Sequence, residues 1–168
     1  NHAEDKMLII DSDLVPVIEK IIDQCPLVRA CVILCDENVL PENNLPNAIS
    51  YEKFLSTGND NFSWIKGEET DACGICYTSG TTGNPKGVVY THRSNTLHAL
   101  TQAAPDMLNL SSQDSIMPVV PLFHANGWSI AYTAPLVGAS IIFPGGDMSP
   151  KSLYEMLEKG VTITAAVP

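Results

Sequence analysis

Short apolar runs alternate with polar, glycine-rich or proline-rich stretches along this chain. Each run is four to seven residues long and is rich in β-branched or apolar side chains, which is typical of buried strands. The predicted strands are Met7–Ile10, Ala30–Leu34, Ala72–Thr78, Gly87–Thr91, Ser115–Val120, Ser140–Phe143 and Thr162–Val167.

Helical periodicity fills most of the gaps between these strands. We expect helices over residues 12–22, 51–55, 93–104, 124–134 and 149–160. Ser50 and Ser149 are predicted N-caps, and Pro150 follows Ser149 at the position where a first-turn proline is favoured.

Two of the predicted helices carry an apolar face. The first face comprises Leu14, Val17, Ile18, Ile21 and Ile22, and the second comprises Leu97, Leu100, Thr101 and Ala104. Strands that alternate with helices in this way predict a layered α/β fold with a largely parallel sheet and flanking helices.

Charge is distributed unevenly around the net value of −10 at pH 7. Residues 1–71 hold 14 acidic and 5 basic side chains, whereas residues 72–168 hold 5 acidic and 4 basic ones. No cluster of Lys or Arg indicates a nucleic-acid partner or a polybasic membrane patch. The chain also has no signal peptide and no apolar run long enough to cross a bilayer, so we expect a cytoplasmic protein without a transmembrane segment. Peripheral attachment to a membrane and an organellar location stay open.

Five cysteines include the pair Cys73 and Cys76, whose C-x-x-C spacing is compatible with redox or zinc chemistry. Both residues lie in the predicted strand Ala72–Thr78, and no nearby His or second tight pair completes a zinc ligand set. We therefore expect both thiols to be buried packing residues rather than ligands.

The most informative stretch is the segment Tyr77–Gly87, which reads YTSGTTGNPKG. Its glycines allow backbone N–H groups to turn toward a ligand, and its short hydroxyls and single lysine add donors and a cation. Successive amides in such a turn form an anion-binding concavity, so a phosphate chain is the expected guest. A plain exposed hairpin loop is the alternative, although a simple turn rarely needs this density of glycine and hydroxyl residues.

The order of residues argues against the common P-loop of kinases and NTPases. That loop ends in Gly-Lys-Ser/Thr and opens a helix. Here Lys86 precedes Gly87 and an apolar β-branched run, which predicts a strand on each side of the loop.

This loop resembles the signature loop of the AMP-binding, adenylate-forming superfamily. A second block, Pro118–Trp128, reads PVVPLFHANGW and is similar to the next motif of medium- and long-chain fatty acyl-CoA synthetases in that superfamily. The resemblance runs from about Leu14 to Pro168. It implies that residues 1–168 are a partial N-terminal AMP-binding domain, and that the C-terminal domain is absent from this sequence.

The resemblance implies a two-step ligation. A carboxylate attacks the α-phosphate of ATP to give an acyl-adenylate and pyrophosphate, and coenzyme A then displaces AMP to give a thioester. ATP, Mg²⁺, coenzyme A and a fatty acid or other small carboxylic acid are thus the implied cofactors and partners. An aromatic-acid CoA ligase or a luciferase-like enzyme is a related alternative, and a non-catalytic nucleotide-binding module is a more distant one.

The same resemblance assigns roles to particular residues. The phosphate-binding set is Thr78, Ser79, Gly80, Thr81, Thr82, Gly83 and Lys86. Thr78 is also the implied Mg²⁺ contact, and Lys86 and His124 are the implied catalytic side chains. Trp128 resembles the gate of the fatty-acid tunnel. If residues 124–134 are helical, His124 and Trp128 share one face; a buried aromatic beside a satisfied histidine is the simpler alternative.

Overall fold

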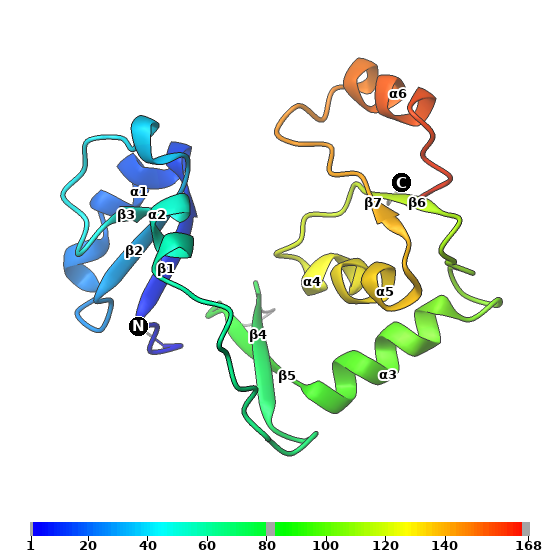
Figure 1. The fold of residues 1–168 in the computed structure, drawn as a ribbon, viewed down its shortest axis with the longest axis horizontal. Coiled ribbons are helices and arrows are strands. Elements are labelled where there is room, and N and C mark those ends of the chain that lie inside the picture. Colours follow the sequence, from blue (N-terminus) through cyan, green and yellow to red (C-terminus); the bar gives the residue numbers. More distant parts are fainter. Residues whose placement is uncertain (1, 80–82, 166–168) are drawn as a thin grey trace. The chain divides into compact units, whose positions relative to one another are not determined.

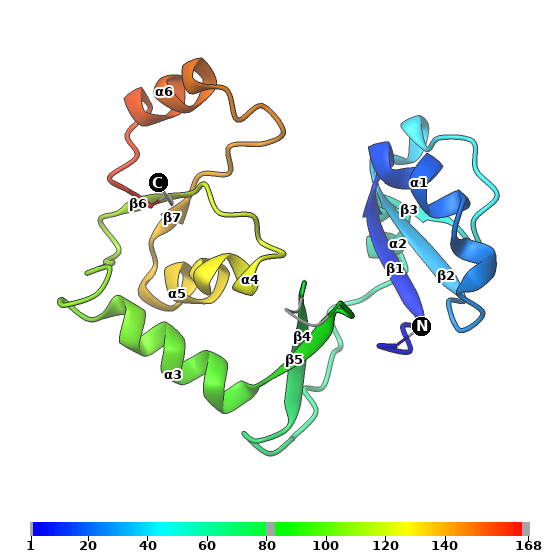
Figure 2. The same cartoon turned by 180° about the vertical axis from the view of Figure 1, so that it is seen from behind.

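A computed structural model describes residues 2–79 and 83–165 of the chain (Figures 1 and 2). The chain divides into two units, Asn1–Ile65 and Lys66–Pro168, each with its own internal packing. No helix within the described residues is long and apolar enough to cross a membrane.

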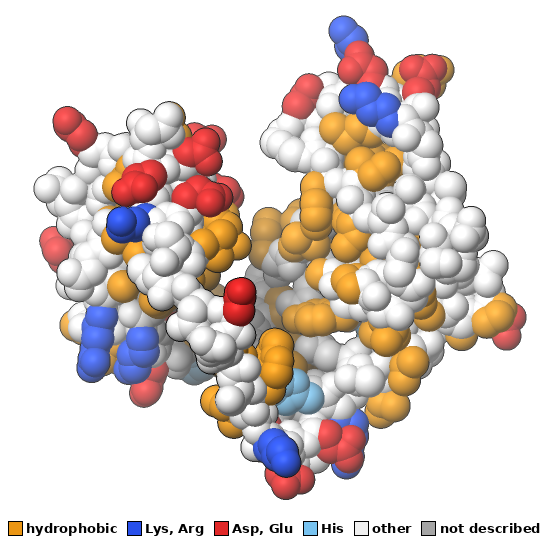
Figure 3. Space-filling view, viewed as in Figure 1, with side chains coloured by type: hydrophobic (Ala, Val, Ile, Leu, Met, Phe, Trp, Pro, Cys, Tyr) orange, Lys and Arg blue, Asp and Glu red, His pale blue; other side chains and the backbone are white. Residues whose placement is uncertain are grey.

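The first unit is built on a parallel three-stranded sheet in the order β1-β2-β3. Its elements are β1 (Met7–Asp11), α1 (Val15–Glu19), β2 (Ala30–Leu34), β3 (Ile49–Ser50) and α2 (Tyr51–Ser56), with 3₁₀ turns at Ser12–Leu14, Ile22–Gln24 and Glu37–Val39. Ser50 caps α2 as predicted, because its Oγ accepts a hydrogen bond from Lys53 N at 3.2 Å. Acidic side chains are prominent on the face of this unit that Figure 3 shows.

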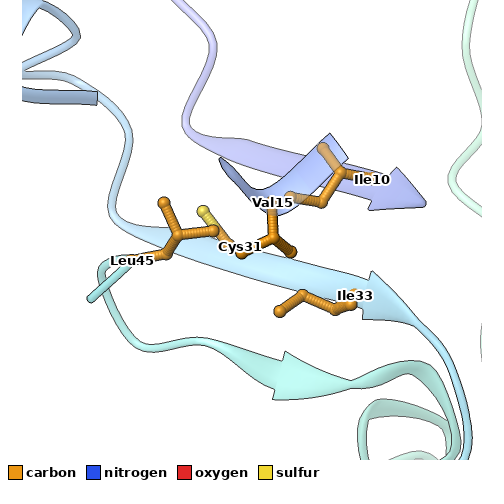
Figure 4. Close-up of a cluster of buried hydrophobic side chains, with 5 residues drawn as sticks. All are labelled: Ile10, Val15, Cys31, Ile33 and Leu45. Atoms are coloured by element: carbon orange, nitrogen blue, oxygen red, sulfur yellow. The ribbon is translucent and has the colours of Figure 1, made fainter. Parts of the chain in front are cut away.

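The core of the first unit is a small apolar cluster under α1. It comprises Ile10, Val15, Cys31, Ile33 and Leu45, whose side chains converge between β1, β2 and the segment before β3 (Figure 4). Burial raises the pKa of the Cys31 thiol, which therefore behaves as a small apolar side chain.

The predicted apolar face of the first helix is only partly correct. The helix is shorter than predicted, and Val15 rather than Leu14 or Val17 enters the core. Ile18 and Ile22 pack against the core, whereas Ile21 is exposed. The 3₁₀ turns on either side of α1 change the helical period, so spacing based on 3.6 residues per turn assigns the wrong face.

The second unit begins with an antiparallel hairpin of β4 (Ala72–Thr78) and β5 (Lys86–Thr91). The remaining elements are α3 (His92–Ala103), β6 (Ser115–Pro118), α4 (Ala125–Trp128), α5 (Ile130–Val137), β7 (Ser140–Ile141), α6 (Pro150–Glu158) and β8 (Ile163–Ala165). The last three strands form a parallel sheet in the order β7-β6-β8. In both ribbon views α5 lies between α3 and this sheet.

Side chains cap two helix starts in the second unit, of which the cap at Ser149 was predicted. Thr91 and Ser94 form a reciprocal capping box at the start of α3, with N–H···O distances of 3.1 Å and 3.0 Å. Ser149 caps α6 ahead of Pro150, and its Oγ accepts from Ser152 N at 3.3 Å. These local contacts fix helix starts without help from the core.

The predicted apolar face of α3 is wrong. Leu97 and Leu100 are 57% and 53% exposed, whereas Asn95, Ala99 and Gln102 are buried. The buried amides are tolerated because each has a hydrogen-bond partner: Asn95 Nδ2 donates to Cys73 Sγ at 3.2 Å, and Gln102 Oε1 accepts from Thr133 Oγ1 at 2.8 Å. The sequence pattern therefore identified the helix but not the side that faces α5.

The layered α/β class is confirmed, with two parallel sheets, flanking helices and one antiparallel hairpin. The predicted strands over residues 115–120 and 140–143 are shorter in the structure. The strand predicted at Thr162–Val167 is seen as β8 up to Ala165, and residues 166 and 167 lie outside the described residues.

Candidate functional site

The hairpin of β4 and β5 presents the glycine- and hydroxyl-rich loop at one end. Thr78 and Lys86 are cross-strand partners at the last position before the loop, and both are exposed. Directly opposed residues on antiparallel strands have Cβ atoms about 4.5–5.5 Å apart. The side chains of Thr78 and Lys86 therefore start from neighbouring positions where the loop begins and ends.

The loop occupies residues 79–85, of which Gly80, Thr81 and Thr82 lie outside the described residues. Ser79 is exposed next to Thr78. Gly83 has φ +100°, a conformation that a side chain would strain. The strand prediction on both sides of the loop is confirmed, and the helix that a P-loop requires does not follow Lys86.

A close packing contact fixes the strand beside the loop. A Cβ at Gly87 would lie 3.1 Å from Ile75 Cγ2 and 3.4 Å from Tyr77 Cζ. Because Tyr77 and Gly87 are cross-strand partners, the absent side chain leaves room for the tyrosine ring. The hairpin thus has a specific reason for glycine immediately after Lys86.

The second motif approaches the hairpin through Cys76. This thiol is buried and donates to the carbonyl of Phe123 at 3.1 Å, which holds the residue before His124 against β4. The packing role predicted for Cys76 is confirmed. The prediction for Cys73 is wrong, because this residue is exposed at a β-bulge. Its Sγ lies 3.5 Å from the Tyr90 carbonyl oxygen and accepts a hydrogen bond from Asn95 Nδ2.

The predicted helix over residues 124–134 is wrong in its first half. Ala125, Asn126, Gly127, Trp128 and Ser129 all have φ between +47° and +58°, which is the left-handed region. A right-handed helix starts only at Ile130, as α5. The prediction failed because Gly127 lets the chain turn the other way, while Asn tolerates this conformation better than most residues.

This left-handed turn changes the expected relation of His124 and Trp128. The argument that they share one face of a right-handed helix does not apply. His124 is exposed ahead of the turn, with its backbone N–H donating to Pro121 O at 2.9 Å. Trp128 is half-buried and forms part of the wall of a cavity of about 330 Å³ in the second unit. His124 does not line that cavity.

Arg93 and the segment before β4 brace the start of α3. The Glu69 carboxylate accepts a hydrogen bond from the Arg93 guanidinium and raises the pKa of Arg93. The backbone adds two contacts, from Arg93 N to Glu69 O at 2.7 Å and from His92 N to Asp71 O at 3.2 Å. The structure therefore gives Arg93 a positioning contact in the second unit.

The side chains of this site offer few ligands for a metal ion. The described part of the chain holds no group of three His, Cys, Asp or Glu side chains that could bind one. Mg²⁺ prefers oxygen ligands and is commonly held by one or two protein groups together with substrate phosphates. The exposed Thr78 hydroxyl at the mouth of the loop fits that pattern as a single protein ligand.

Sequence reasoning missed the polar side chains behind this site. Asn95 and Gln102, seven residues apart, lie on the buried face of α3, and Gln102 lines the cavity beside Trp128. Their helical spacing is a usable signal, but the leucines on the other side of the helix produced the stronger apolar pattern.

Comparison with known proteins identifies the family of the chain. The family described as AMP-binding enzyme matches residues 1–168. The whole chain is 45% identical to a medium-chain-fatty-acid–CoA ligase from Ectopseudomonas oleovorans, covering 31% of that protein. It is 44% identical to a long-chain-fatty-acid–CoA ligase from Thermus thermophilus, covering 30% of it.

Solved structures lead to the same group. A long-chain-fatty-acid–CoA ligase from Archaeoglobus fulgidus superimposes with a TM-score of 0.76 at 25% identity, over 95% of this chain and 29% of that one. The chain thus spans about 30% of the length of the curated relatives it matches. It belongs to the AMP-binding enzyme family and is related to fatty-acid–CoA ligases over its full length.

Proposed function

We propose that this member of the AMP-binding enzyme family is the phosphate-binding part of an ATP-dependent acyl-CoA synthetase. The observation that carries the proposal is the hairpin: a glycine- and hydroxyl-rich loop closes β4 onto β5, with Thr78 and Lys86 paired at its mouth. In this proposal residues 1–168 are part of a larger N-terminal domain, and a C-terminal domain outside this sequence completes the enzyme.

The loop residues act by positioning and by neutralising charge. Thr78, Ser79 and the segment Gly80–Gly83 embrace the β- and γ-phosphates of ATP through backbone amides and hydroxyls. Lys86 places its ammonium beside the pyrophosphate that leaves when the carboxylate attacks the α-phosphate. Nucleotidyl transfer depends mainly on such positioning and electrostatic stabilisation. Lys86 is the only Lys, Arg, Asp or Glu in residues 72–91. No acidic side chain of the hairpin therefore neutralises its positive charge.

Mg²⁺ and coenzyme A belong to the proposal as well. Thr78 supplies one oxygen toward the metal, which neutralises phosphate charge when it is bound. Coenzyme A is the second substrate, and its thiol displaces AMP from the acyl-adenylate. Because ATP and coenzyme A are intracellular substrates, we place the enzyme in the cytoplasm.

His124 and Trp128 act on the acid. His124 follows the Cys76–Phe123 contact, so its exposed imidazole is held near the hairpin and can face the reacting carboxylate. Trp128 gates the cavity beside α3, whose volume of about 330 Å³ lies in the lower part of the range for small-molecule sites, about 300–1,000 Å³. A fatty acid is preferred over an aromatic acid in this proposal.

Thioester formation by the intact protein tests the proposal. The protein is incubated with ATP, Mg²⁺, coenzyme A and one acid at a time: octanoate, palmitate or benzoate. We expect AMP, pyrophosphate and acyl-CoA in equal amounts, with octanoate or palmitate preferred. A preference for benzoate would support the aromatic-acid alternative, and ADP formation or no thioester at all would contradict an AMP-forming ligase.

A further inference from the structure

The cavity beside Trp128 has several hydrogen-bonding side chains in its wall. Its wall includes Tyr90, Asn95, His98, Gln102, Trp128 and Ser129. Five of these six side chains carry a group other than an indole that can form hydrogen bonds. In ligand cavities a few polar groups fix the orientation of the ligand, so each polar side chain of this wall is a candidate contact.

Gln102 is the most constrained of these polar groups. It is 7% exposed, and its Oε1 accepts from Thr133 Oγ1 at 2.8 Å. Thr133 is fully buried on α5, and its hydroxyl also lies 3.1 Å from Ser129 O. A hydroxyl has one proton, and the shorter contact assigns it to Gln102. The amide is thereby oriented, with its oxygen toward α5 and its nitrogen on the other side.

The Gln102 amide nitrogen lies on the side of the amide away from Thr133. None of the hydrogen bonds among the described residues uses Nε2, whose two protons need acceptors. No fully enclosed side-chain nitrogen or oxygen in the described part of the chain lacks a partner, so Nε2 is not sealed in the protein. Gln102 lines the cavity, so the cavity is open space that Nε2 can reach.

An alkyl tail would displace water from this donor without accepting a hydrogen bond from it. Leaving a buried donor unsatisfied carries the full cost of its desolvation. A site built to hydrogen-bond a substrate group therefore rejects the analogue that lacks it more strongly than an apolar pocket discriminates between chain lengths.

We propose that Gln102 Nε2 donates to an oxygen atom within the acyl chain, so that the enzyme favours acids with an ether or keto oxygen over alkyl acids of equal length. This inference rests on the proposed function, because it takes the cavity beside Trp128 as the acyl subsite. Thr133 is a positioning residue that holds the amide with its donor toward the substrate.

Acids of equal length test this selectivity in the intact enzyme. We compare octanoate with 6-methoxyhexanoate and 4-propoxybutanoate, in which one methylene of the octanoate chain is replaced by oxygen at different depths. The measured quantity is the ratio of kcat/KM for each ether acid to kcat/KM for octanoate. We expect this ratio to exceed one for at least one ether acid in the wild type.

Substitution then assigns the selectivity to Gln102. Gln102→Met keeps the length and shape of the side chain but removes the donor, and should lower the ratio about 3- to 10-fold, the range for one neutral hydrogen bond. Gln113→Met makes the same change on an exposed loop residue and should keep the wild-type ratio. Thr133→Val should lower the ratio too, because the Gln102 amide loses the hydroxyl that orients it.

The outcomes separate the inference from the function beneath it. Thioester formation with no ratio above one, or with an unchanged ratio in Gln102→Met, would overturn the inference alone. Absence of thioester from every acid would overturn the proposed function and the inference together. If Gln102→Met fails to fold, the wild-type ratio and its value in Thr133→Val decide the question.

Discussion

At the scale of single residues, the left-handed turn at Ala125–Ser129 is the most demanding feature of the chain. A residue other than glycine costs roughly 1–2 kcal/mol in this conformation, and four of the five residues in the turn are not glycine. Gly127 sits at the centre of the turn, and a Cβ there would lie 2.6 Å from Leu122 Cδ2.

Gly127→Ala should therefore be more destabilising than other glycine substitutions in the second unit. We expect a loss of about 1–3 kcal/mol in the free energy of unfolding, from left-handed strain and crowding against Leu122. Two matched variants separate these causes. Gly138 has φ +79° but only an ordinary 3.5 Å contact, and Gly146 has open space and no positive φ.

Urea unfolding of the intact protein measures the free energy of unfolding of the three variants. The expected order of destabilisation is Gly127→Ala, then Gly138→Ala, then Gly146→Ala. A Gly127→Ala protein as stable as Gly146→Ala would show that the turn is not left-handed or that Leu122 moves freely.

At the scale of elements, a carboxylate joins β6 to the start of β8. Asp114 Oδ2 accepts from the Ser111 hydroxyl at 2.8 Å and from Ser111 N at 2.9 Å, and its Oδ1 accepts from the Thr162 hydroxyl at 2.8 Å. These hydrogen bonds, with that from the Ser111 hydroxyl the largest cause, hold the pKa of Asp114 below its ordinary value.

This lowered pKa predicts a pH-dependent contribution to stability. Because the folded state favours the ionised carboxylate, the contribution is fully present above the unfolded pKa of about 3.9 and is lost as pH falls through the folded value. Asp114→Asn should lower Tm at neutral pH, and the difference from the wild type should shrink below about pH 4.

Thermal unfolding of the intact protein between pH 7 and pH 3 checks this expectation. Asp106→Asn, at an exposed carboxylate of the same unit, is the matched control and should differ little from the wild type at any pH. A constant difference between wild type and Asp114→Asn across the whole range would contradict the role assigned to the ionised carboxylate.

Elements with local signals could be predicted from the sequence, whereas orientations set by tertiary contacts could not. Ser50 and Ser149 cap helices through contacts within three residues, and the β4–β5 hairpin follows from its two predicted strands. The buried face of α3 depends on partners 22 and 31 residues away, at Cys73 and Thr133. No local period reveals such partners, so Asn95 and Gln102 were not among the predicted site residues.

At the scale of the whole molecule, the chain matches only a part of each ligase that it resembles. It spans about 30% of its curated relatives and includes the hairpin loop and the cavity beside Trp128. Catalysis depends on holding reacting groups in a narrow geometry, and that advantage is lost when part of the constellation is missing.

The 168-residue chain alone should accordingly form no acyl-CoA. We expect no thioester when the purified chain is incubated with ATP, Mg²⁺, coenzyme A and octanoate or palmitate, while weak binding of ATP through the loop persists. Liquid chromatography of the products measures the thioester, with the intact enzyme as the positive control. Clear turnover by the chain alone would show that its residues suffice for both half-reactions.

We propose that the loop between Thr78 and Lys86 binds the phosphates of ATP during activation of the acid. Fatty-acid-dependent exchange of labelled pyrophosphate into ATP isolates this half-reaction in the intact enzyme. Lys86→Ala removes one charge-assisted hydrogen bond, worth about 1.5–3 kcal/mol, and should slow exchange about ten- to a hundred-fold. Lys151→Ala, at a lysine whose side chain is 87% exposed on α6, should exchange at the wild-type rate. An unchanged rate in Lys86→Ala would contradict the phosphate-binding role of the loop.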